Sequence, residues 1–236
     1  MTDTLAPTAT PTETSGEIIT DSLADRLAAV WEDFEARLAR VPVLARLDDG
    51  TATIEDYRRL LFNLRQQVVD GSLWISRAAS NFDIPHFELR AAAIKHAEEE
   101  HRDYLMIERD YVAVGGTLAE LRAGRKNLGS EALSGYMFHY ADQPNPVGLM
   151  GAMFIIEGLG ARRAAAWAAR YQELLGLADS QVHFMRYHEQ ADAAHTGDLE
   201  AILTSGIVDE SAADEIVRCA EVVARLYALQ LEELDN

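Results

Sequence analysis

Apolar residues recur every three to four positions through most of the chain from residue 17 onward, and few stretches alternate as strands do. The breaks between these stretches carry capping and turn signals, among them Thr53 with Asp56 and the Gly115-Gly116 pair. The expected helices span about residues 18–38, 53–79, 85–114, 130–141, 147–174, 180–203 and 211–233, with a short one after 117. We therefore predict an all-α protein, with one helical domain of about seven or eight helices over residues 17–236.

Charge and targeting signals narrow the classes of partner. Residues 1–16 have neither the basic start nor the apolar stretch of a signal peptide, so we expect a disordered N-terminal tail. The longest apolar run, 147–156, is about half the ~20 residues that a membrane-spanning helix needs. A net charge of −18 repels both nucleic acid and anionic lipid, and neither is expected as a partner. The single cysteine, Cys219, cannot form an internal disulfide, which favours a cytoplasmic location.

Three polar residues interrupt the apolar face of the expected helix over 180–203. His188, Asp192 and His195 share one stripe because they follow each other by four and three positions. Phe184 and Leu199 continue this stripe on either side. A buried carboxylate there needs a cation, and imidazole beside carboxylate suits iron, manganese or zinc. A hydrogen-bonded core network, or a stripe turned toward water, is the alternative.

Glu157 stands alone as an acid in the apolar segment FIIEGLG. A lone buried carboxylate needs a partner, and the small residues that follow leave room for a metal ion, oxygen or a substrate chain. An arginine from another helix is the alternative partner.

The acidic segment HAEEEHRDY holds a second ligand pattern. Glu98 and His101 are three positions apart, the spacing of metal sites in helical bundles, on a face that Ile94 marks as apolar. A solvated run of charges is the alternative. Glu108 lies close to the same face and is a reserve candidate, whereas His96 points about 140° away and is expected to be exposed or structural.

Taken together, these motifs resemble the ligand set of the heme-oxygenase-like diiron oxidases and oxygenases. The order of the motifs and their gaps of 56 and 31 residues match, and the resemblance covers most of the chain after about residue 50. It implies a heme-oxygenase-like helical bundle in which Fe(II) is bound by Glu98, His101, Glu157, His188, Asp192 and His195. In this reading Glu157 is the catalytic, bridging carboxylate.

The chain departs from this family in the helix ahead of Glu98. Members usually supply a further glutamate there, but this chain offers Gln66, Gln67 and Asp70, of which Gln67 lies nearest the apolar stripe. An amide is a poorer ligand than a carboxylate, so we expect two ferrous ions with a labile second site. Heme oxygenases themselves place a histidine on the first helix, and this chain has none before His86.

The resemblance implies an oxygenase or oxidase that uses O2 to oxidise a small organic substrate. An amino acid or amine is favoured, through N-oxygenation or oxidative C–C cleavage, because no long apolar channel is visible in the sequence. Gln67, Phe154 and Arg162 are the candidate substrate contacts. A partner-binding protein with a structural metal clip, and a cofactorless oxidase of the same fold, are the alternatives. A homodimer and a reductase or carrier protein remain open as partners.

Overall fold

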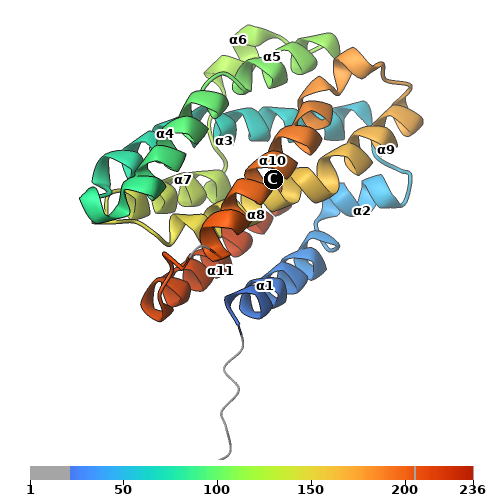
Figure 1. Ribbon diagram of the computed structural model, residues 1–236. Coiled ribbons are helices and arrows are strands. Elements are labelled where there is room, and N and C mark those ends of the chain that lie inside the picture. Colours follow the sequence, from blue (N-terminus) through green and yellow to red (C-terminus); the bar gives the residue numbers. More distant parts are fainter. Residues whose placement is uncertain (1–21, 205, 236) are drawn as a thin grey trace, which may run out of the picture.

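The computed structural model describes residues 22–204 and 206–235, and all regular structure within them is helical (Figure 1). The predicted tail over 1–16 lies outside these residues. The main helices are α1 (Leu23–Leu38), α2 (Pro42–Asp48), α3 (Ile54–Asn81), α4 (Phe87–Glu100), α5 (Tyr104–Ala113), α6 (Leu118–Ala123), α7 (Leu128–Ala141), α8 (Leu149–Leu159), α9 (Ala165–Leu175), α10 (His183–Thr204) and α11 (Glu210–Glu232). Short helical turns are η1 (Ile84–His86), η2 (Gly160–Ala164), η3 (Asp179–Gln181) and η4 (Glu233–Asp235). The all-α, single-domain prediction is confirmed.

Local sequence explains where these helices begin and end. The predicted cap of α3 forms a reciprocal pair, in which the Asp56 amide donates to Thr53 Oγ1 at 3.2 Å and the Thr53 amide donates to Asp56 at 2.8 Å. The expected helix over 85–114 is two helices, because the chain turns between α4 and α5 at residues 101–103. The expected helix over 147–174 runs from α8 through a π-helical turn, η2, into α9.

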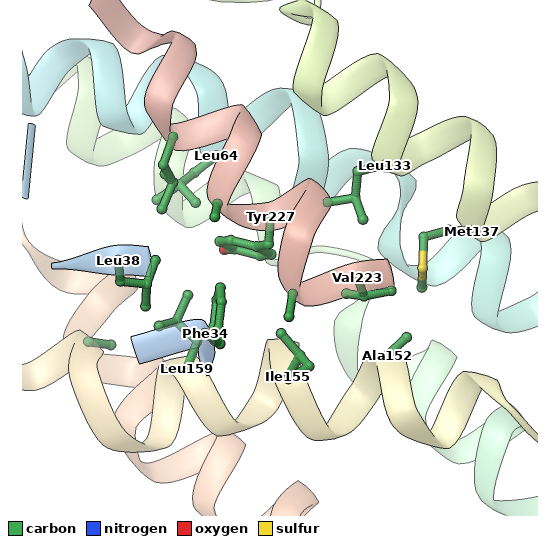
Figure 2. Packing of buried hydrophobic residues seen from close by; sticks show 14 of the residues in the cluster. Phe34, Leu38, Leu64, Leu133, Met137, Ala152, Ile155, Leu159, Val223 and Tyr227 are labelled. Carbon is green, nitrogen blue, oxygen red and sulfur yellow. The ribbon is translucent and has the colours of Figure 1, made fainter. Parts of the chain in front are cut away.

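The core forms where α8 packs along α11 (Figure 2). Ile155 and Leu159 on α8 point toward Val223 and Tyr227 on α11, and Phe34 of α1 closes the same cluster. These side chains are almost fully removed from water, which makes their burial the main stabilising term. The opposite side of α8 packs against α10, so polar groups on that side face neighbouring helices. None of the described helices is both long and apolar enough to cross a bilayer.

One buried acid fixes the start of α10. Asp110 on α5 is 0% exposed, and its Oδ2 accepts the Phe184 amide at 2.8 Å. Its Oδ1 finds no hydrogen-bond partner among the described residues. Burial raises the pKa of Asp110 to about 6.

This pKa predicts a pH-dependent contribution to stability. The folded pKa lies above the ordinary value of 3.8, so the stability due to protonated Asp110 is full below pH 3.8 and is lost as the pH rises through about 6. We expect Asp110→Asn to remove roughly 2–3 kcal/mol of the difference in unfolding free energy between pH 4 and pH 8. Urea denaturation at both pH values measures it, with the exposed Glu131→Gln as control. An unchanged difference in Asp110→Asn would contradict the assignment.

Candidate metal centre

Two adjoining groups of histidine and acid side chains meet between α4, α8 and α10. The first group contains His96, Glu100, Glu157 and His195, and the second contains Glu100, Asp103 and His188. In each group one potential ligand atom per residue lies within 4.8 Å of all the others. Glu100, the last residue of α4, belongs to both groups.

Glu157 lies at the middle of the first group and is 6% exposed. Its Oε2 lies 3.1 Å from His195 Nδ1, and its Oε1 lies 3.3 Å from His96 Nε2. Glu100 Oε1 lies 3.7 Å from each of these two nitrogens. The His96 contact is too poorly aligned for a hydrogen bond, so its Nε2 has no hydrogen-bond partner among the described residues. These atoms form a set of nitrogen and oxygen donors from two buried and two half-buried residues, all close to one another.

Neighbouring groups orient the histidine rings. His188 Nδ1 lies 2.8 Å from the Phe184 carbonyl oxygen, which can only accept, so Nδ1 carries a proton and Nε2 is the ring atom that faces the centre. That Nε2 lies 3.1 Å from Asp103 Oδ2. His195 similarly places Nε2 3.2 Å from Glu99 while Nδ1 faces Glu157. Such outer contacts fix the tautomer and the ring orientation of metal-binding histidines.

The charges of the site call for a cation. Burial, and then the nearby charges of Glu157, Glu100 and Asp103, raise the pKa of Asp192 well above its ordinary value. Asp192 Oδ1 has no hydrogen-bond partner in the described structure. Burial raises the pKa of Glu157, but contacts with His195 and His96 outweigh it and hold that pKa below its ordinary value. Carboxylates and imidazoles crowded in this way are stabilised by a divalent ion, and this donor set suits iron, manganese or zinc.

Gly160 leaves room for the Asp192 side chain at the centre. Gly160 begins the π-helical turn after Glu157, and a Cβ atom there would overlap Asp192 Oδ2. A π-helical turn inserts an extra residue into a helix and is common at functional sites. Because residue 160 has no side chain, the backbone of η2 can lie close to α10.

Replacing this glycine should damage both fold and site. We expect Gly160→Ala to lower the free energy of unfolding by about 1–3 kcal/mol, because Asp192 must move out of a packed interior. Iron affinity should fall about 10-fold or more with the displaced carboxylate. Thermal unfolding and an anaerobic iron titration measure the two effects. The control is Gly135→Ala on α7, where a Cβ meets no described atom within 4 Å. Equal behaviour of the two variants would refute the steric role of Gly160.

The structure brings together part of the predicted ligand set. Glu157, His188 and His195 lie in the two groups, and Asp192 is buried beside them. Their role as ligands stays a prediction.

The predicted positions of Glu98 and His101 are wrong. Both are exposed and border an outer groove between α3 and α4. Ile94, which marked the predicted core face, is 56% exposed, so the inward face of α4 is a different one. His96, expected to be exposed or structural, is 6% exposed and belongs to the first group. The reserve candidate Glu108 pairs with Arg122 at 2.6 Å and lies in neither group.

The sequence did contain a signal for the residues that take their place. His96, Glu100 and Asp103 follow each other by four and three positions, as His188, Asp192 and His195 do. Two elements with the same spacing of polar residues can face each other with all six side chains inward.

The predicted substrate contacts separate in the structure. Gln67 lines two small cavities of about 50 and 90 Å³ beside Glu157, and its Oε1 accepts from Gln230 at 2.6 Å. Phe154 and Arg162 instead lie against Trp31 of α1. The Arg162 guanidinium stacks 4.1 Å from a Trp31 ring, and the two aromatic rings are 6.1 Å apart. Neither residue lines the two cavities beside Glu157, and their role as substrate contacts stays a prediction.

Cys219 offers no nucleophile to the site. It is 0% exposed on α11, and burial raises the pKa of its thiol to about 11. The reactive thiolate is therefore scarce at neutral pH.

Comparisons with known proteins identify the family and the fold of the chain. A family model described as an iron-containing redox enzyme matches residues 74–228. A domain of unknown function with a heme oxygenase-like fold from Shewanella denitrificans superposes with a TM-score of 0.84 at 19% identity, covering 92% of each chain. A TenA homolog from Pseudomonas syringae gives 0.75 at 16% identity, covering 91% of this chain and 93% of the other. A TenA homologue from P. horikoshii gives 0.68 at 16% identity, with 90% and 97% covered. The comparison with curated proteins finds no match.

Proposed function

Because the chain belongs to the family of iron-containing redox enzymes, we propose that it is an O2-dependent non-heme iron oxidase or oxygenase acting on a small organic substrate. The observation that carries this proposal is the pair of ligand groups that share Glu100. Two metal positions with a common carboxylate are typical of helical-bundle di-iron sites.

The donor set fits two ferrous ions of unequal affinity. The first group, with two histidines and two glutamates, would hold one ion, and Glu100, Asp103 and His188 would hold the other. Together with the buried Asp192, these acids are four carboxylates, which balance the charge of two divalent ions. The group with fewer ligands would be the labile site.

The described residues prepare this site for chemistry. Bound iron would pass electrons to dioxygen and so activate it as the oxidant that takes electrons from the substrate. Glu99 accepts the Nε2 proton of His195 and so leaves Nδ1 free toward the centre. Phe184 and Met185 lie beside Asp192 and His188 and keep water away from that side. The protein thereby contributes ligand geometry, proton placement and a dry surround.

Anaerobic iron loading followed by rapid mixing with O2 tests the proposal. Iron content should approach two ions per chain, and mixing with O2 should give optical changes within seconds and O2 consumption. A panel of amines, amino acids and fatty acids then shows which compound accelerates the decay of that signal. Tightly bound zinc without O2 consumption would instead support a structural metal clip. Substrate turnover after complete chelation would support a cofactorless oxidase.

A further inference from the structure

An apolar chamber of about 440 Å³ opens beside the candidate metal centre, between α3, α4, α8 and α10. Its lining includes Trp74, Phe82, Leu89, Met150, Met153 and Leu199. This volume lies in the range of pockets that enclose small organic ligands. The sequence suggested no long apolar channel, because the residues that build this chamber come from four separate helices.

Two histidines of the first ligand group form one wall of the chamber. His96 and His195 both line it. His96 is 6% exposed, and its Nε2 is a polar atom with no hydrogen-bond partner among the described residues. A ligand in the chamber would therefore lie next to the groups proposed to hold iron, so the chamber is continuous with the site.

The charges around the chamber favour a cation over an anion. Apart from the two histidines, whose rings contact the Glu157 and Glu100 carboxylates, its charged lining residues are Glu88, Glu99, Asp198 and Lys95. Lys95 is already engaged, with Nζ 2.8 Å from Asp198 and 3.8 Å from Glu99. Glu88 makes no ion pair within the described part of the chain. A carboxylate ligand would meet excess negative charge, whereas an ammonium group would find acceptors.

The arrangement along α4 orients such a ligand. Glu99 lies 3.2 Å from His195 at the end near the metal centre, and Leu89 lies toward the other end of the helix. Ten positions on a helix correspond to about 15 Å, enough for a medium-length chain. The Trp74 ring lines the same space and can pack on an alkyl group or an ammonium.

We infer that the chamber binds an apolar primary amine, with its ammonium group at Glu99 and its hydrocarbon body between α3, α4 and α8. This inference names the substrate class of the proposed oxidase and rests on that function for the chemistry that follows binding. The binding itself depends on the chamber alone.

Calorimetric titration of the purified full-length chain with octylamine, octanoate and 1-octanol tests the inference. Octylamine should bind about 10-fold or more tightly than octanoate, with octanol between them. Octanoate binding as tightly as octylamine would overturn the inference, and so would the failure of all three to bind.

Two chamber variants and one control variant locate the binding. Ala93→Trp fills the chamber and should weaken octylamine binding about 10-fold or more, whereas Ala166→Trp on the exposed face of α9 should not. Glu88→Lys changes an exposed side chain and should lower the ratio of octylamine affinity to octanoate affinity about threefold or more. The affinity for octanol should stay unchanged. Equal octylamine affinity in all three variants would place the ligand elsewhere.

The same titrations separate this inference from the proposed function. Octylamine binding by a chain that takes up iron but consumes no O2 would leave the inference standing and defeat the oxidase. Iron-dependent O2 consumption by a chain that does not bind octylamine would do the reverse.

Discussion

Glu157→Gln should bind iron at least about 100-fold more weakly than the natural chain and lose O2 consumption with it. Glu157 contacts both histidines of the first group, at 3.1 and 3.3 Å, and is 6% exposed. Glutamine has nearly the same volume but no charge, so the helix packing survives while the site loses a central ligand. Iron retained after anaerobic desalting, measured per chain, gives the result directly.

The control for this variant is Glu189→Gln, an exposed acid on α10 outside both groups. It should retain iron as the natural chain does. Circular dichroism of both variants establishes that they are folded. A folded Glu157→Gln that keeps full iron and turnover would remove the basis for the proposed oxidase.

His96→Ala and His101→Ala should differ sharply, although the two residues are only five positions apart. His96 is buried in the first ligand group, whereas His101 is exposed and its Nδ1 lies 2.7 Å from the Glu98 carbonyl oxygen. We expect His96→Ala to weaken iron binding about 10- to 100-fold and His101→Ala to leave it within about twofold. Anaerobic iron titration of the two variants in parallel measures the difference.

The glutamates beside them provide a matched second pair. Glu100→Gln should impair iron binding at both positions, and Glu98→Gln at neither, since Glu98 is exposed and belongs to neither group. If His101→Ala and Glu98→Gln lost iron while the other two kept it, the ligands would be those that the E-x-x-H spacing indicated.

The helical class and the polar stripe of α10 could be predicted from sequence because both depend on local spacing. His188, Asp192 and His195 interrupt an apolar face, and the structure buries that face as expected, with Leu199 on the same side. Glu157 was recognisable for the same reason. Periodicity reports which residues of one helix share a side, and for these two helices the side was clear.

The inward face of α4 could not be predicted in this way. Its residues alternate between short apolar stretches and charges, so more than one face looked apolar, and Ile94 marked the wrong one. The turn at residues 101–103 contains neither glycine nor proline, so no turn signal marks the break between α4 and α5. Packing against α3, α8 and α10 determines which face of α4 is buried. The sequence of α4 alone does not specify this tertiary packing.

If both groups bind iron as proposed, the carboxylate that they have in common makes their occupancies interdependent. An ion bound in the first group would hold the Glu100 side chain in one orientation and would neutralise part of its negative charge. The first ion thus changes the affinity of the second position, and thermodynamic reciprocity requires the second to change the first by the same factor. Iron uptake should therefore follow a two-phase binding isotherm, and Glu100→Ala should weaken both phases and make the affinity at each position independent of the other.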